Sequence, residues 1–218
     1  MHNLSLILSR SSTGIDAPLI TVETHLGNGL PSFSIVGLPE KAVQESRERV
    51  RAAIVNANFE FPARRITVNL APADLPKEGS RFDLPIAIGI LAASGQIESR
   101  ALQQHEFIGE LALSGELRPV RGALPAALAA ARSGHSLALP LVNADESACV
   151  NNLRILAFSS LLQLSEHFNG TQPTAPWKPD PRRLEKPAPL PDLRDVIGQE
   201  QAKRALLIAA AGSHSLLM

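Results

Sequence analysis

Residues 69–95 read NLAPADLPKEGSRFDLPIAIGILAASG, and this stretch decides the fold. Its first part, 71–80, holds two prolines and a glycine and is typical of a loop. The run that follows, 81–94, is largely apolar and ends at Gly95, a frequent kind of helix stop. A helix that is apolar on all sides has to be buried. We therefore expect a helix over 81–94 inside the core.

The sequence on both sides of this helix alternates between strand and helix patterns. Strands are expected at 4–8, 19–26, 32–37, 65–70, 107–113, 116–120, 137–139 and 154–158, and helices at 39–58, 123–132, 144–150 and 160–168. Asn28-Gly29 is a strong turn signal between the second and third strands, and Ser114-Gly115 suggests a hairpin between the fifth and sixth. This order predicts an α+β fold in which helices cover a sheet.

The composition changes after Asn169-Gly170. Residues 171–192 read TQPTAPWKPDPRRLEKPAPLPD and contain seven prolines, which suit an extended linker and exclude a helix or an inner strand. Within it, Trp177 is expected to pack the linker onto the domain rather than to stack on a base. A helical pattern returns over 195–212. The sequence thus predicts a domain at 1–170, a proline-rich linker at 171–192 and a further segment at 193–218.

Composition limits the classes of protein that fit. Of the 218 residues, 44% are hydrophobic and 19% are charged, and the formal net charge is zero, which is typical of a globular protein rather than a disordered or strongly nucleic-acid-seeking one. Any contact with DNA would need a local basic patch. Cys149 is the single cysteine, which excludes an internal disulfide. The N-terminal apolar stretch is too short for a signal peptide or a membrane span, so we expect a cytoplasmic protein without membrane contact.

Three segments carry a resemblance to a known family: 28–53 (NGLPSFSIVGLPEKAVQESRERVRAA), 69–95, and 109–131 (GELALSGELRPVRGALPAALAAA). They resemble the N-terminal domain of ComM-type proteins, which belong to the magnesium-chelatase-like AAA+ ATPases. The resemblance implies a ribosomal protein S5 domain 2-like fold, with the mixed sheet of the Lon protease domain, placed before an ATPase module. It also implies a hexameric ring that drives DNA branch migration in natural transformation, with ATP and Mg²⁺ as cofactors of the full-length protein.

The segment 195–212, DVIGQEQAKRALLIAAAG, resembles the opening of the AAA+ module. By that resemblance Val196, Ile197 and Gly198 would line the adenine side of an ATP site. The sequence has no G-x-x-x-x-G-K-[ST] motif and no Gly-Lys pair, so it lacks the loop that cradles phosphates. We expect the chain to be the front part of a longer protein that ends before this loop, to hold no cofactor itself and to hydrolyse no ATP.

The likeness to Lon raises a serine-lysine peptidase as an alternative. By resemblance, the nucleophile would fall on Arg81 and the lysine on Leu124, neither of which can serve. Ser80 lies one residue early, and Ser80 to Asp83 fits an S-x-x-D pattern in which the serine hydroxyl caps a helix. We therefore expect a helix cap at Ser80 and no catalytic residue.

Basic residues outnumber acids between 41 and 65. Arg47, Arg51, Arg64 and Arg65 are the candidates for contact with DNA. The alternative is a solvated helix face with local ion pairs such as Glu45 with Arg49.

The six histidines show no metal-ligand spacing, so no metal site is expected and the histidines are assigned to the surface or to turns. The leading hypothesis is a non-catalytic accessory domain of an AAA+ DNA motor. A regulatory or scaffold domain of a chelatase-like complex that does not act on DNA remains open.

Overall fold

A computed structural model describes residues 3–13, 15–179 and 192–217 of the chain. The chain forms two compact units, 1–179 and 180–218, and each is described by itself. Residues 180–191, the larger part of the predicted linker, lie outside the described residues. No helix in the described ranges is long and apolar enough to cross a membrane.

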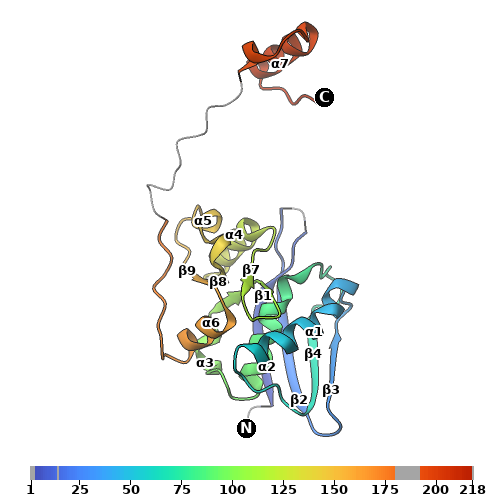
Figure 1. Ribbon diagram of the computed structural model, residues 1–218, viewed down its shortest axis with the longest axis vertical. Coiled ribbons are helices and arrows are strands. Elements are labelled where there is room, and N and C mark those ends of the chain that lie inside the picture. Colours follow the sequence, from blue (N-terminus) through green and yellow to red (C-terminus); the bar gives the residue numbers. More distant parts are fainter. Residues whose placement is uncertain (1–2, 14, 180–191, 218) are drawn as a thin grey trace. The chain divides into compact units, whose positions relative to one another are not determined.

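The first unit is built on a seven-stranded mixed sheet (Figure 1). Its strands are β1 (Leu4–Arg10), β2 (Leu19–Gly27), β3 (Ser32–Val36), β4 (Arg65–Ala71), β5 (His105–Phe107), β8 (Ser136–Pro140) and β9 (Ile155–Phe158), in the order β3-β4-β2-β1-β5-β8-β9. β2 runs antiparallel to both β1 and β4, and the other neighbours in the sheet are parallel. The expected α+β fold with a mixed sheet is confirmed.

Helices cover this sheet. They are α1 (Lys41–Asn56), α2 (Asp83–Ala93), α3 (Ser99–Leu102), α4 (Ala123–Ser133), α5 (Ala144–Ser147) and α6 (Leu161–Phe168), with short 3₁₀ turns η1 (Ser80–Phe82) and η2 (Leu141–Asn143). Every residue of α2 is buried, and the helix packs against β1, β2 and α1. The central core helix predicted from the apolar run is therefore confirmed.

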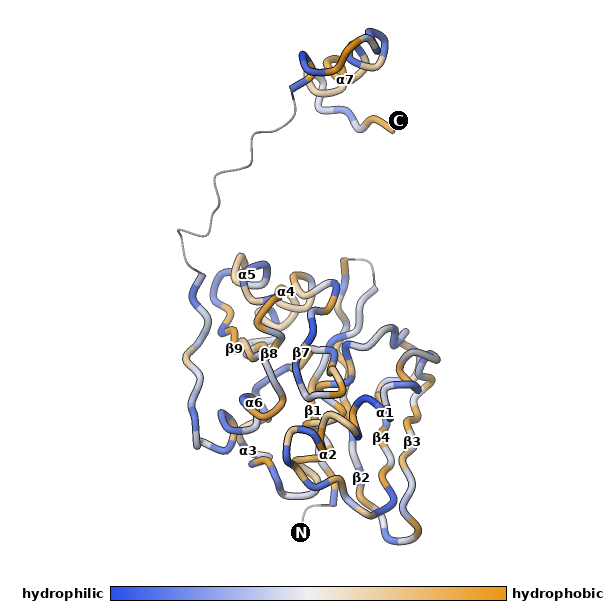
Figure 2. The backbone as a smooth tube through the Cα atoms, viewed as in Figure 1, coloured by the Kyte–Doolittle hydropathy of each residue, from blue (hydrophilic) through white to orange (hydrophobic). Residues whose placement is uncertain are grey.

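The two faces of the sheet are covered differently. In β8, Ala138 packs with α2 and α6 on one face, while Leu137 and Leu139 pack with α4 and α5 on the other. In β1, Ile7 lies in the core under α2, but Leu4 and Leu6 on the opposite face are 55% and 57% exposed. Along β4, hydrophobic and hydrophilic residues alternate in Figure 2, and Ile66, Val68 and Leu70 are buried. Helices α4 and α5 thus cover only the half of that face nearest β9.

Asn28-Gly29 lies in the connection between β2 and β3, so the predicted turn is confirmed. The turn joins β2 to β3, but β4 lies between the two strands and pairs with both. A turn signal reports only local backbone geometry, so it cannot tell that a later strand enters between its arms. Gly37 directly follows β3, and an added Cβ there would lie 2.9 Å from the carbonyl carbon of Leu70, so a side chain is excluded at this position.

The hairpin predicted around Ser114-Gly115 is shorter than expected. It consists of β6 (Glu110–Leu111) and β7 (Leu117–Arg118), while His105–Phe107 joins the main sheet as β5. Between them Gly109 donates its N–H to the carbonyl of Arg81 and accepts from the N–H of Leu84, both at 3.0 Å. The chain leaves the sheet at this glycine because it bonds to the start of α2.

The first unit extends to residue 179, nine residues beyond the predicted end of the domain. Trp177 packs against the core cluster beneath α4 and α5, so the expectation that this residue fixes the linker to the domain is confirmed.

The second unit contains a 3₁₀ turn, η4 (Leu193–Asp195), and helix α7 (Glu200–Gly212). Asp192 caps the turn by accepting the N–H of Arg194 at 3.0 Å. Leu207 and Ile208 in α7 are 61% and 58% exposed.

Candidate functional site

The position expected for a peptidase nucleophile holds a buried arginine. Arg81 lies in η1, directly before α2, and is 6% exposed. Its guanidinium donates hydrogen bonds to the carbonyl oxygens of Arg10 (3.4 Å), Ser11 (3.2 Å) and Arg121. Arg81 therefore joins the start of α2 to the end of β1 and to the turn before α4.

The position expected for the lysine base holds Leu124, which lies in the first turn of α4 and is 39% exposed. The turn before this helix contains Gly122, where an added Cβ would lie 3.3 Å from a terminal nitrogen of Arg81. The guanidinium thus packs directly against the start of α4. A protonated guanidinium cannot act as the nucleophile, and the aliphatic side chain of Leu124 cannot take a proton from one.

The cap predicted at Ser80 is wrong. Gly79 occupies the N-cap position, and the Ser80 hydroxyl donates instead to the Oε2 atom of Glu110 in β6. A capping serine needs extended backbone before the helix, whereas Ser80 already lies inside the 3₁₀ turn. Asp83, the last residue of the S-x-x-D pattern, is bound by Arg49 and not by the backbone of the 3₁₀ turn.

Asp83 forms a buried ion pair with Arg49 of α1. Arg49 donates to the two carboxylate oxygens at 2.8 and 3.1 Å, and the N–H of Leu111 donates to Oδ2 at 3.3 Å. Burial raises the pKa of Asp83 to about 6, against the opposing effect of Arg49. The side chain of Arg49 therefore turns into the domain, and the predicted pairing with Glu45 along the helix surface does not describe its main contact.

Lys77, in the loop before α2, is fully buried. Its Nζ donates to the carbonyl of Pro72 within the same loop, and burial lowers the pKa of Lys77. The hydroxyl of Ser11 donates to the carbonyl of Pro76. Two carbonyl groups of the loop before α2 therefore accept side-chain hydrogen bonds, one from Lys77 within the loop and one from Ser11.

The four candidate DNA-contact arginines lie near the first residues of β3 and β4. In α1, Arg47 is exposed and donates to the carbonyl of Phe33 at 3.4 Å, and Arg51 lies 5.2 Å from the centre of the Phe61 ring. The rings of Phe33 and Phe61 are 6.0 Å apart, so the residues that Arg47 and Arg51 contact are neighbours.

The other two candidates are Arg65, the first residue of β4, and Arg64, which directly precedes it. Arg65 is exposed and lies opposite Ser32 of β3. Arg64 is half-buried and donates to the Oδ1 atoms of Asn3 (3.2 Å) and Asn28 (3.0 Å). The structure therefore leaves Arg47, Arg51 and Arg65 more accessible than Arg64.

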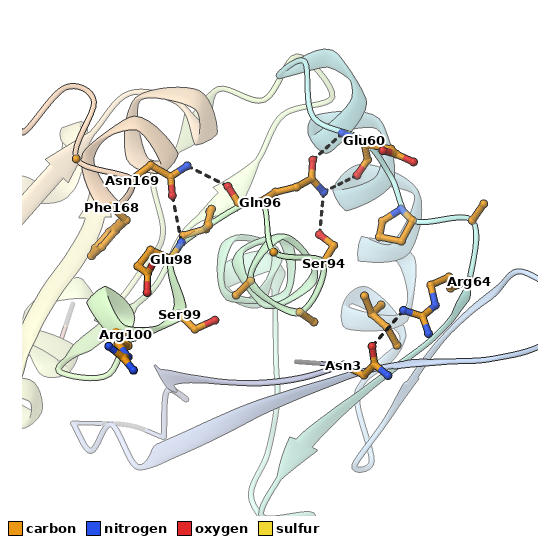
Figure 3. A pocket seen from close by; sticks show the side chains of 18 residues that line it. Asn3, Glu60, Arg64, Ser94, Gln96, Glu98, Ser99, Arg100, Phe168 and Asn169 are labelled. Carbon is orange, nitrogen blue, oxygen red and sulfur yellow. Dashed lines mark hydrogen bonds between the residues drawn. The ribbon is translucent and has the colours of Figure 1, made fainter. Parts of the chain in front are cut away.

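Arg64 also lines a groove of about 1120 Å³ beyond the end of α2 (Figure 3). The Gln96 side chain donates to the Glu60 carbonyl and accepts from its N–H, both at 2.9 Å. Asn169 in turn donates to the Gln96 carbonyl at 2.9 Å and accepts from the Glu98 N–H at 3.1 Å. Sequence reasoning missed this groove, because no local motif signals amide side chains that join distant loops.

The assignment of the histidines to the surface or to turns is partly wrong. His105 and His167 are half-buried and pack against Phe168, at ring distances of 5.0 and 4.9 Å. His135 Nδ1 lies 2.8 Å from the carboxylate of Glu106. Within the described ranges, no three metal-ligating side chains gather at one place.

The expected adenine-side residues lie in the second unit, between η4 and α7. Ile197 is 98% exposed, Val196 is 42% exposed and Gly198 has a φ of 72°. Two accessible apolar side chains beside a glycine suit contact with a flat base.

Comparison with known proteins places these features in a family. The family described as subunit ChlI of Mg-chelatase matches residues 22–143, and the one described as magnesium chelatase, subunit ChlI, matches residues 192–218. The chain is 52% identical to competence protein ComM of Haemophilus influenzae (strain ATCC 51907 / DSM 11121 / KW20 / Rd), over 99% of this chain and 43% of ComM.

Two further relatives are uncharacterized proteins. YifB of Escherichia coli (strain K12) is 48% identical over 99% of this chain and 42% of its own length. A protein of Mycobacterium tuberculosis (strain ATCC 25618 / H37Rv) is 39% identical over 94% of this chain and 41% of its own length. The chain thus spans less than half the length of these relatives. Because a single family matches more than half of its residues, the chain belongs to the magnesium-chelatase ChlI family, as a ComM-like member.

Proposed function

We propose that this chain is the non-catalytic N-terminal part of a magnesium-chelatase-like AAA+ ATPase that drives DNA branch migration in natural transformation. The observation that carries the proposal is the 52% identity to competence protein ComM over 99% of the chain. Since the chain spans 43% of ComM, the motor activity is assigned to a longer protein.

The side chains at the dyad positions support a non-catalytic role. Arg81 is engaged by three carbonyl groups, and Leu124 has no group that exchanges a proton. The hydroxyl of Ser80 bonds to a carboxylate, Glu110, rather than to a lysine. The domain thus uses the Lon-like arrangement for structure.

ATP and Mg²⁺ are proposed as cofactors of the longer protein. Val196, Ile197 and Gly198 fit the adenine side of such a site, but no phosphate-binding loop occurs among the 218 residues. The residues present therefore do not hold the phosphates, and this chain is proposed to bind no nucleotide tightly. Assembly into a six-membered ring is proposed to depend on the ATPase module, and the DNA contact on Arg47, Arg51, Arg64 and Arg65.

A second candidate is a regulatory or scaffold domain in a complex that handles a protein or a metal-porphyrin. The descriptions of the matched families, which name a subunit of Mg-chelatase, favour it.

A chimera separates the two candidates. The matching part of ComM in Haemophilus influenzae is replaced by residues 1–218, and transformation by chromosomal DNA is measured in cells that lack native ComM. The expected result is recovery of transformation, with ComM lacking this part as the negative control. A chimera that is folded and hydrolyses ATP but leaves transformation at the level of that control would contradict the DNA role and favour the second candidate.

A further inference from the structure

The segment after α6 is held on the domain by a series of hydrogen bonds. The N–H groups of Thr171 and Gln172 donate to the carbonyl of Glu166, at 2.9 and 3.2 Å. The N–H of Thr174 donates to the ring nitrogen Nδ1 of His167 at 2.8 Å. Figure 1 shows this segment running from the end of α6 past β9 towards α5.

Trp177 provides the last anchor. Its backbone N–H donates to the carbonyl of Ile155 at 2.8 Å, on the open edge of β9, and its indole Nε1 donates to Oδ1 of Asp145 in α5 at 3.0 Å. The indole ring packs on the adjacent core cluster. A partly exposed aromatic anchor with two hydrogen bonds is a contact of moderate strength, so the segment can dock without being permanently fixed.

We propose that residues 171–177 form a releasable strap that fixes where the chain leaves the domain, and that His167 holds this strap only in its neutral form. Nδ1 can accept the Thr174 N–H only while it carries no proton. A protonated imidazole is a donor at both nitrogens, so protonation removes the acceptor and places two N–H groups against each other.

The surroundings of His167 favour the neutral form. Burial and, to a smaller extent, Arg154 lower the pKa of His167. His105 lies in the same aromatic cluster, and the electrostatic interaction with His167 lowers the pKa of His105. The strap has the sequence TQPTAPW and brings no titratable group. Release is therefore expected only below the ordinary histidine pKa of about 6.5.

Docking changes the starting point of the connection to the second unit. With the strap docked, this connection begins after Trp177, beside β9 and α5, and with the strap released it begins after Gly170, at the end of α6. The seven residues of the strap add at most about 25 Å of chain. Release of the strap therefore moves the point at which the chain leaves the first unit.

Trp177 is the only tryptophan in the chain, so its fluorescence reports on the strap directly. Acrylamide quenching of the 218-residue chain is measured from pH 8 to pH 5, with far-UV circular dichroism to show that the fold persists. The expected result is weak quenching at pH 8 and stronger quenching below about pH 6.5. Chymotrypsin cleavage after Trp177 should increase over the same range.

Two variants and one control decide the role of His167. His167→Phe keeps the ring packing but removes the acceptor, and Thr174→Pro removes the donor without touching the core. Each should raise the released population about fivefold at pH 8, the equivalent of one hydrogen bond, and abolish the pH dependence. His105→Phe changes a histidine of the same aromatic cluster that makes no bond to the strap, and should keep the transition.

Three results would overturn the proposal. One is a Trp177 as accessible at pH 8 as a free tryptophan derivative. Another is equal quenching of the wild type and both strap variants at pH 8. The third is a pH transition that persists in Thr174→Pro.

Discussion

The carboxylate of Glu106 accepts two hydrogen bonds from the guanidinium of Arg10, at 2.6 and 2.5 Å. The Glu106 side chain is fully buried, and that of Arg10 is 7% exposed. Arg10 also donates to the hydroxyl of Ser133 at 2.7 Å and to the carbonyl of Ala17 at 3.1 Å. This ion pair joins β1, β5 and the end of α4, so it holds α4 against the sheet.

Replacing Glu106 with Gln should lower the free energy of unfolding by about 3 to 5 kcal/mol, because it leaves the Arg10 charge buried without a counter-charge. The measurement is urea unfolding at neutral pH. The double variant Arg10→Met, Glu106→Leu should lose less than the single one, since it removes both charges together. A single variant as stable as the wild type would show that the pair contributes nothing to holding α4.

Helix α2 packs tightly against β1 and β2 at Gly89. The Ser5 hydroxyl donates to the Gly89 carbonyl at 2.7 Å, and an added Cβ would lie 3.3 Å from Thr24 Cβ and closer still to its hydroxyl oxygen. Gly89→Ala should therefore destabilise the domain by about 1 to 3 kcal/mol through overpacking, although alanine favours a helix by about 1 kcal/mol.

Thr24→Ala supplies the matched test. The Thr24 hydroxyl is buried and has no hydrogen-bond partner among the described residues, so its removal should cost little. Gly89→Ala should then be better tolerated in the Thr24→Ala background than in the wild type. Equal costs in both backgrounds, by thermal or urea unfolding, would show that the two residues are not in steric conflict.

The hydroxyl of Ser80 is expected to contribute to stability alone. Ser80→Ala should lower the free energy of unfolding by about 1 kcal/mol, because it removes the hydrogen bond to Glu110. Casein cleavage by the wild-type chain should be absent, with Glu110→Gln as a control that keeps an acceptor for the hydroxyl. Casein cleavage by the wild-type chain that disappears in Ser80→Ala would contradict the non-catalytic role.

Acid should destabilise the first unit through His105. Burial lowers the pKa of His105, so the folded state binds its proton less readily than the unfolded state does. Stability from this group is fully present above the ordinary pKa of about 6.5 and is lost as the pH falls towards the folded pKa. Urea unfolding at several pH values between about 8 and 5 measures the loss.

The matched variant is His105→Phe. Its ring can keep the contacts with Phe107 and Phe168, and the buried Nδ1, which has no partner among the described residues, is removed. Asp83, whose pKa is raised to about 6, changes stability in the opposite direction between about pH 4 and 6, but it is present in both proteins. The difference between them should therefore grow in favour of the variant below pH 6.5. A difference that is constant with pH would contradict the assignment.

The parts of the fold that could be predicted are those with a strong local period. The apolar run at 81–94 and the amphipathic pattern at 39–58 predicted α2 and α1 because burial of one helix or one helix face leaves a direct pattern in the sequence. The partner of a strand leaves no such pattern. The turn between β2 and β3 was correctly predicted, but the sequence did not show that β4 lies between these two strands in the sheet.

The sequence predicted which residues occupy the peptidase positions, but it did not predict the contacts that these residues make. Resemblance pointed to Arg81 and Leu124, and both lie at the junction of α2 and α4. The predicted capping role of Ser80 required Asp83 to take part in the cap. Instead, the Asp83 carboxylate binds Arg49 of α1, 34 residues earlier in the sequence. Such a contact decides which hydrogen bonds are left for the neighbouring residues, and it exists only once α1 has packed against α2.

DNA binding by the 218-residue chain should be weak and steeply dependent on salt. Arg47, Arg51, Arg64 and Arg65 can neutralise at most four phosphates, so the logarithm of the affinity should fall with the logarithm of the salt concentration with a slope no steeper than about −3.6. Fluorescence anisotropy of labelled branched DNA, measured over a series of KCl concentrations, gives this slope.

Single substitutions of these arginines by Gln should act unequally. Arg51 and Arg65 are exposed, so Arg51→Gln and Arg65→Gln should each reduce the slope by about 1. Arg64→Gln should reduce it less, because that guanidinium already bonds to two asparagine side chains. Arg132→Gln, at an exposed arginine of α4 outside the proposed contact, is the control and should leave the slope unchanged. If Arg132→Gln lowers the slope as much as Arg51→Gln does, binding is non-specific attraction to any surface cation, and the assignment of DNA contact to the start of β3 and β4 is wrong.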